Sequence, residues 1–231
     1  MGLIHTPRTL ASIAKGLWRR HQLLGGASTT VTQPSSKGSQ TPIGFGLGNA
    51  YRYKSRVGLF DVDYLGHMNN AAYLSHAEFA RWEMMSCNGL LSHFFKSKMH
   101  FIVASTAVRY RQEIRPLFGS FVVESFVAAM DERSVWIFQN FVTPKDGRLR
   151  TQVIVQGVLV AASGPKKGVT KPADVFTESM GVDKDVVASL CVPLSSENDT
   201  DQDVFHNINE VIGNYSKLET SVRELASRTE E

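Results

Sequence analysis

The chain has 231 residues, of which 42% are hydrophobic and 20% are charged, and this composition suits one ordinary globular domain with appendages. No uninterrupted apolar run approaches the roughly 18 to 20 residues that span a bilayer, so we expect no transmembrane segment. The net charge of +3 is local, because the chain beyond residue 45 holds 20 basic and 22 acidic side chains, and this excludes the clustered cations that a nucleic-acid partner requires.

Residues 1–46 predict a mitochondrial transit peptide followed by a linker. Thr6 and Pro7 are placed as N-cap and first residue of a basic amphipathic helix. A Ser/Thr-rich tract without acids follows at 27–41. The alternative is a disordered basic N-terminus that addresses nothing. The apolar side of the helix holds Leu10, Ile13, Ala14, Leu17 and Trp18, and another side holds Arg8, Lys15 and Arg19.

Polar groups gather between the first expected strand and a long helix. Residues 51–57 alternate between two faces, as in a half-buried strand. Residues 60–73 read Phe-Asp-Val-Asp-Tyr-Leu-Gly-His-Met-Asn-Asn-Ala-Ala-Tyr, and a helix is predicted over 70–88 with Gly89 as its C-cap. We therefore look for chemistry where the loop meets this helix.

An antiparallel meander is predicted after a connecting piece at 90–98. The segments are rich in Val, Ile and Phe, and an Asp-Gly turn separates the last two. One strand, a helix and four long strands make an α+β domain over 47–165, in which one sheet wraps or packs on one long helix. The four expected strands are at about 100–112, 118–130, 134–143 and 149–162.

Residues 166–231 are predicted to form a tail. Gly, Pro and Lys after Ser163 and the acidic run at 195–203 are typical of surface connections, so we expect the core to end before them. Apolar residues at spacings of four and three then predict an amphipathic helix at about 203–228. We expect it to pack against the body of the protein; a short coiled coil is the alternative.

The two cysteines, Cys87 and Cys191, are too few for a disulfide scaffold and lack metal-ligand spacing. We expect incidental thiols in a reducing compartment, and neither a metal nor a redox cofactor.

The order of strand, D-x-D-x-x-G-H-M-N-N-x-x-Y motif, helix and long meander resembles the hotdog-fold thioesterases, the superfamily of 4-hydroxybenzoyl-CoA and acyl-ACP thioesterases. Residues 63–73 look most like its thioesterase-superfamily-member-6-like branch. The similarity covers about 48–162. It implies a hotdog fold, a curved antiparallel sheet around one long helix, and a homodimer or homotetramer with active sites at subunit boundaries.

The resemblance also implies site residues. In the 4-hydroxybenzoyl-CoA type the catalytic aspartate lies three residues before a glycine, which here are Asp63 and Gly66. The plant acyl-ACP type carries a similar H-x-N-N-x-x-Y run. Asp63 is the expected nucleophile or base, aided by His67 and Asn69, and the expected substrate-binding residues are Gly66, Asn70 and Tyr73.

Each residue also has a structural interpretation. Asp63 and His67 could merely stabilise the loop, and either Asn69 or Asn70 could cap the helix. Asp61 is interpreted as structural, since it points to the opposite face if the strand persists. Glu78 is interpreted as a solvated helix position, although another hotdog subgroup uses a helical glutamate.

The sequence therefore predicts an acyl-CoA or acyl-ACP thioesterase of the mitochondrion. Thioester hydrolysis needs a nucleophile, or a base that makes one, and stabilisation of the oxyanion. The alternative is a non-catalytic hotdog module that binds an acyl chain or a protein partner. A hotdog hydratase is less well supported, because the Asn-Pro of those enzymes is absent.

Overall fold

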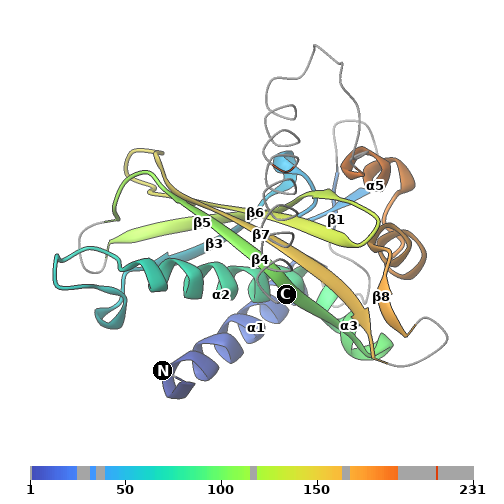
Figure 1. Cartoon of the computed structure of the whole chain (residues 1–231), viewed down its shortest axis with the longest axis horizontal. Coiled ribbons are helices and arrows are strands. Elements are labelled where there is room, and N and C mark those ends of the chain that lie inside the picture. The colour runs from blue at the N-terminus through green and yellow to red at the C-terminus, as the bar shows by residue number, and fades with distance from the viewer. Residues whose placement is uncertain are drawn as a thin grey trace, which may run out of the picture.

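The computed structural model describes residues 2–24, 32–34, 40–114, 119–162, 167–191 and 212. A six-stranded antiparallel sheet curls around helix α2 (Asn70–Asn88), and helix α1 (Gly2–Leu24) lies on the side of α2 away from the sheet (Figure 1). The predicted hotdog fold of the α+β class is confirmed.

The strand order of the sheet is β3-β5-β6-β7-β4, with β8 also paired to β7. Every pairing in it is antiparallel, and the four predicted long strands are confirmed within a few residues at each end. The predicted meander is wrong for the first of them, because β4 pairs with β7 and β5 pairs with β3, so that only β5, β6 and β7 form a meander. Among the described strands β4 is an edge strand, because only β7 pairs with it. The bounds are β3 (Tyr51–Arg56), β4 (Met99–Tyr110), β5 (Ser120–Met130), β6 (Ser134–Val142), β7 (Leu149–Ala161) and β8 (Gly168–Thr170).

Helix α2 begins and ends where the sequence predicts. Asn69 is its N-cap, and Gly89 closes it with a φ of 89°, a left-handed conformation that glycine adopts without strain. Ala77 and Ala80 are fully buried, and these small side chains let the helix lie close to the concave face of the sheet. The helix thus carries the polar loop at its N-terminus to one end of the sheet.

Several short elements lie where loops were expected. Helix α3 (Leu90–Ser97) replaces the connecting piece, and it buries Leu90, Leu91 and Phe94. A strand pair, β1 (Thr32–Pro34) and β2 (Gln40–Pro42), and two 3₁₀ turns, η1 (Leu47–Asn49) and η2 (Leu59–Asp61), precede the long helix.

The packed core extends beyond the expected end at residue 165. Three helical segments follow β8, and they bury Phe176, Val187 and Leu190 at 3% exposure or less. The Gly, Pro and Lys residues around these segments lie in the connections between them, so the composition of the region does not reveal the apolar residues that pack in the core. The segments are α4 (Pro172–Asp174), the π-helical η3 (Val175–Ser179) and α5 (Lys184–Leu190).

Of the predicted helix at 203–228 the structure describes only Ile212, which is helical and 6% exposed. Ile212 belongs to a second apolar cluster with Trp136 and Phe138 of β6. The rest of that helix lies outside the described residues. No helix in the described part of the chain is long and apolar enough to cross a membrane.

Helix α1 begins at Gly2, so the prediction of Thr6 as N-cap and Pro7 as first residue is wrong, and Pro7 lies inside the helix. The helix faces the domain with its basic side and not with its apolar side. Leu10 and Trp18, on the predicted apolar side, are 60% and 61% exposed. The basic side instead faces α2 and the loop before it, where Arg8 and Lys15 meet buried carboxylates. Charge pairing therefore sets the orientation of α1, because burying an unpaired carboxylate costs more than exposing a few apolar side chains.

Candidate active site

The loop before α2 is a small hairpin that carries Asp63 and His67. Val62 pairs with Met68 as an antiparallel bridge, and the Asp63 N–H donates to the His67 carbonyl at 3.0 Å. The Gly66 N–H donates to the Asp63 carbonyl at 3.1 Å, and Gly66 has a φ of 76°. Gly66 therefore serves the turn through a backbone conformation that other residues rarely adopt.

The carboxylate of Asp63 is fixed but open to solvent. Its Oδ1 accepts the Leu65 N–H at 2.9 Å, and its Oδ2 lies 3.1 Å from Nδ1 of His67. The two side chains are 24% and 20% exposed. Nδ1 of His67 also lies 3.3 Å from the Met68 carbonyl, and because both neighbours are acceptors, Nδ1 carries the proton. The structure thus brings two of the predicted catalytic residues together.

Asn69 is the residue that caps α2. Its Oδ1 accepts the Ala72 N–H at 2.8 Å, so the capping role that was open between the two asparagines belongs to Asn69. The cap uses the side-chain oxygen, which leaves the amide nitrogen of Asn69 for a substrate. Asn70 is exposed in the first turn, and its carbonyl accepts the Tyr110 hydroxyl at 3.2 Å.

Tyr73 lies in the core rather than on an open surface. It is 2% exposed, its ring packs edge-on against Tyr110 and Phe141, and its hydroxyl accepts the Ile114 N–H at 3.2 Å. Burial raises the pKa of Tyr73. This position favours a structural role for Tyr73, which ties the end of β4 to the helix, over the predicted substrate contact.

Asp61 forms a buried support behind the loop, in line with its structural interpretation. Its carboxylate is 3% exposed and accepts the Gly58 N–H at 2.8 Å, while its carbonyl accepts the Asn69 N–H at 2.8 Å. Nε2 of the buried His76 lies 2.9 Å from Oδ2, and Nη1 of Arg8 lies 3.0 Å from Oδ1. Asp61 therefore joins both ends of the loop to α1 and α2.

The charges of this support follow from its burial. Burial alone would raise the pKa of Asp61, but hydrogen bonds from His76 and Arg8 outweigh it and hold that pKa well below its usual range. Burial lowers the pKa of His76 more than Asp61 raises it, so the ring is neutral at pH 7. Nε2 of the neutral ring lies 2.9 Å from Oδ2 of Asp61 and 3.0 Å from Nη2 of Arg8, and its Nδ1 has no hydrogen-bond partner among the described residues.

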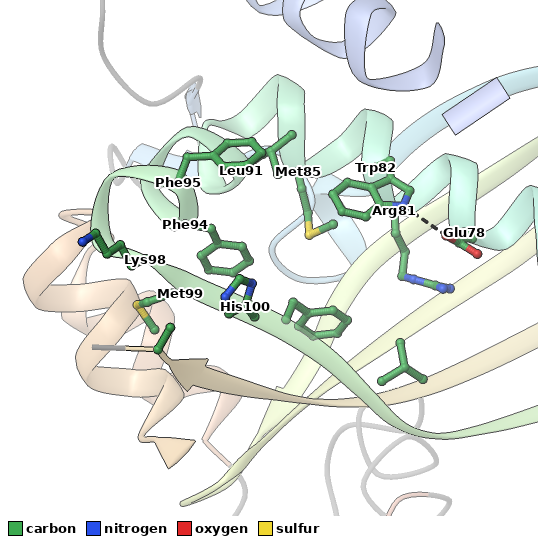
Figure 2. A pocket seen from close by; sticks show the side chains of 13 residues that line it. Glu78, Arg81, Trp82, Met85, Leu91, Phe94, Phe95, Lys98, Met99 and His100 are labelled. Atoms are coloured by element: carbon green, nitrogen blue, oxygen red, sulfur yellow. Dashed lines mark hydrogen bonds between the residues drawn. The ribbon is translucent and has the colours of Figure 1, made fainter. Parts of the chain in front are cut away.

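A pocket of about 650 Å³ lies further along α2, between α2, α3 and the start of β4 (Figure 2). Its wall is mostly aromatic and aliphatic, with charged groups toward the ends. None of the predicted site residues lines it, and Glu78, the first lining residue along α2, is eight positions, about 12 Å, beyond Asn70. The lining includes Glu78, Arg81, Trp82, Met85, Phe94, Lys98 and Phe101.

Glu78 lies at this pocket and is not simply solvated. The Trp82 indole donates to its Oε1 at 3.2 Å, and Nε2 of His5 lies 3.4 Å from its Oε2. The side chain is 39% exposed. Glu78 is thus a second carboxylate within reach of a ligand.

In the described part of the chain, no three His, Cys, Asp or Glu side chains gather closely enough to hold a metal ion.

A model of the thioesterase-like superfamily matches residues 57–185, more than half of the chain. The chain belongs to the thioesterase-like superfamily. The match spans the Asp63 loop, every strand of the sheet except β3, and the segments α4 and η3, so the family's domain reaches past residue 165 as the packing does.

Relatives within this superfamily are similar in the same region. Protein THEM6 from Xenopus laevis is 28% identical over 146 residues, 63% of this chain and 70% of that protein. Protein THEM6 from Danio rerio is 32% identical over 108 residues, 47% of this chain and 53% of that protein. The crystal structure of the probable thioesterase YbaW from Escherichia coli is similar with a TM-score of 0.50 and 19% identity, over 56% of this chain and 97% of that one. This last likeness concerns the fold.

Sequence reasoning missed the pocket and the Arg8–Asp61–His76 support. The pocket arises from residues spread over two helices and a strand, and no local motif marks such a surface. The sequence gives one indication of this support: His76 lies six positions into a helix with an alanine-rich face, and a histidine at such a position is a candidate for burial. Its partner Arg8 lies 68 residues away and could not be paired with it from spacing.

Proposed function

We propose that the protein is a thioesterase that hydrolyses an acyl-CoA or acyl-ACP thioester, with Asp63 as nucleophile or general base. The observation that carries the proposal is the geometry of the Asp63 carboxylate. This carboxylate is partly open, is fixed by Leu65 and His67, and lies in the loop that leads into α2. Membership of the superfamily supports the reaction class.

The proposed chemistry uses groups that this loop already holds. Asp63 takes a proton from water as the water oxygen attacks the thioester carbonyl, or the carboxylate attacks that carbon itself and water releases the acid. Backbone N–H groups in the first turn of α2 and the amide of Asn69 stabilise the oxyanion. In the first route the C–S bond then breaks and the thiolate takes up the proton from Asp63. In the second route the C–S bond breaks as Asp63 forms an acyl anhydride, water then hydrolyses this anhydride, and the thiolate takes up the proton that the water releases.

A homodimer explains why the pocket and Asp63 lie apart in one subunit. The long edge strand β4 begins at the pocket with Phe101 and ends at Tyr110, which bonds to Asn70. Antiparallel pairing of two β4 strands would set the pocket of one subunit beside the Asp63 loop of the other. Ile102 and Val103 are 49% and 42% exposed on this edge, as expected of a strand that pairs with a second copy. A homotetramer would join two such dimers.

Replacing Ile102 by Lys is expected to separate the subunits and abolish at least about 90% of thiol release, because a charge on the edge opposes strand pairing. Light scattering after size-exclusion chromatography measures the mass. The matched control is Val169→Lys, since Val169 is 46% exposed on β8, away from β4. An Ile102→Lys protein with the mass and activity of the control would contradict the dimer.

The apolar pocket is proposed to receive the acyl chain. Figure 2 shows Trp82 and Met85 of α2 on one side of the pocket and His100 of β4 on the other, a space suited to a flexible hydrocarbon. The phosphates of coenzyme A or of an acyl carrier protein would remain outside. The same assay of thiol release, carried out with acyl-CoA and with acyl-ACP, distinguishes these two carriers.

Replacing Ala162 by Phe is expected to shorten the accepted acyl chain, because the side chain at 162 lines the pocket and is exposed. Long-chain acyl-CoAs should lose about 10-fold or more in kcat/KM, while short ones keep theirs. Ala188→Phe, at an exposed position of α5, is the matched control. Equal losses of kcat/KM for short and long acyl-CoAs would argue against binding of the acyl chain in this pocket.

The mitochondrial localisation is part of the proposal, and it depends on the basic amphipathic character of α1. Fluorescence microscopy of the full chain with a C-terminal fusion tests it. Colocalisation with a mitochondrial marker is the expected result, and a signal confined to another compartment would contradict it.

A further inference from the structure

The basic face of α1 lies on two carboxylates that the domain buries. Nη1 of Arg8 is 3.0 Å from Oδ1 of Asp61. Nζ of Lys15 is 3.1 Å from Oε2 of Glu83, and Nη1 of Arg19 is 2.8 Å from Oε1 of Glu83. Three cations of one helix thus meet two anions of the domain.

Glu83 depends on these cations. It is fully buried, and an isolated buried carboxylate is strongly unfavourable. Among the residues that the structure describes, both cations within salt-bridge distance of Glu83 belong to α1. The Tyr51 hydroxyl donates to Oε1 at 2.8 Å, and burial together with Glu83 raises the pKa of Tyr51, so that it stays a donor. Tyr51 supplies a hydrogen bond but no positive charge.

The two helices also fit sterically. A Cβ on Gly16 would lie 2.4 Å from the Glu83 carbonyl oxygen and 2.6 Å from Cβ of Ser86, so only glycine permits this crossing. Ser12 of α1 and Ser86 of α2 are 6% and 0% exposed. Small residues at the crossing and opposite charges beside it make one continuous interface.

This interface covers the basic face of α1. Mitochondrial transit peptides are amphipathic segments that are rich in Arg and Ser and poor in acids. In the folded protein Arg8, Lys15 and Arg19 are occupied by the domain. If α1 targets the protein to a compartment, it therefore does so before the domain folds. The identity of that compartment is a separate question from whether the helix is later removed by proteolysis.

We propose that α1 remains a permanent part of the folded protein, docked by its basic face on Asp61 and Glu83, instead of being removed with residues 1–46. Through Arg8 and Asp61 the helix also supports the loop that carries Asp63. The proposal concerns folding and processing, so it stands or falls independently of the thioesterase reaction.

The first test identifies the N-terminus of the protein in cells. The full chain with a C-terminal tag is produced in cultured eukaryotic cells, purified under native conditions and analysed by intact mass and N-terminal peptide mapping. Recovery of a folded protein that retains residues 2–24 is expected. A mature protein that begins beyond Leu24 would overturn the proposal.

The second test disturbs the crossing without changing charge. Gly16→Leu should lower Tm by about 4 to 10 °C, although leucine is the better helix former, because the added side chain pushes α1 off α2. The matched control is Ala14→Leu, on an exposed position of the same helix, which should shift Tm by less than about 2 °C. Equal Tm values for the two variants would overturn the proposal.

The third test concerns the charges. Lys15→Gln with Arg19→Gln should lower Tm by about 6 °C or more, since Glu83 then lacks a cation. Adding Glu83→Gln to that double variant should restore at least half of the loss. An unchanged Tm in the double variant, or no recovery in the triple variant, would contradict the role of α1 as counter-charge.

Discussion

Replacement of Asp63 by Asn is expected to reduce thiol release from the preferred acyl-CoA by about 10²- to 10⁴-fold, the usual contribution of a positioned acid or base. Asparagine keeps the shape of the side chain and can still accept the Leu65 N–H. It has no charge with which to attack the thioester or to take a proton from water. The loss should therefore lie in kcat, with little change in KM.

Glu78→Gln is the control for this experiment, because Glu78 is the other carboxylate within reach of a ligand. It should keep at least about a third of the wild-type rate. Equal rates for wild type and Asp63→Asn, together with a large loss in Glu78→Gln, would move the chemistry to the helical carboxylate. Release of thiol is followed by its reaction with a chromogenic disulfide.

Replacement of Asp61 by Asn is expected to cost about 3 kcal/mol of the free energy of unfolding at pH 7, because it removes a buried anion from Arg8 and His76. Urea denaturation followed by fluorescence measures this. Asp63→Asn, in the same loop but partly exposed, should cost less than about 1 kcal/mol. We thus expect the two aspartates to have different roles: Asp61 stabilises the fold, and Asp63 is needed for activity. Equal costs for the two variants would refute this division.

The pKa values of Asp61 and His76 predict how the free energy of unfolding depends on pH. The depressed pKa of Asp61 gives stability that is complete above its unfolded pKa of about 4 and is lost as the pH falls below it. The depressed pKa of His76 means that the unfolded chain binds a proton first, so stability also falls below about pH 6.5.

A double variant, Asp61→Asn with His76→Asn, removes both titrating groups. Its free energy of unfolding should change less between pH 7 and pH 3 than that of the wild type, measured by urea denaturation at each pH. A dependence on pH equal to that of the wild type would show that this pair does not control acid stability.

The sequence predicts the fold well because its signals are local. The helix over 70–88 has a capping asparagine before it and a glycine after it, and both are seen. The four long strands follow from dense Val, Ile and Phe, and the hotdog arrangement from the motif between strand and helix. The clustering of Asp63 and His67 is likewise local, since the two residues are four positions apart in a tight hairpin.

Features that depend on distant residues were not predictable. Arg8 and Asp61 are 53 residues apart, and nothing in the amphipathic pattern of α1 shows that its basic side would be the covered one. Tyr73 was expected at the substrate, but a motif position does not reveal that a ring is buried between Tyr110 and Phe141. The helices after β8 escaped notice because they are shorter than a full amphipathic repeat.

We propose that this chain hydrolyses a thioester. The most direct measurement is thiol release by the purified full chain with acyl-CoAs of graded length and with one acyl-ACP. We expect clear turnover that depends on the length of the acyl chain and is lost in Asp63→Asn. No turnover on any member of the panel, with acyl-CoA binding retained, would contradict the claim and would favour a non-catalytic hotdog module.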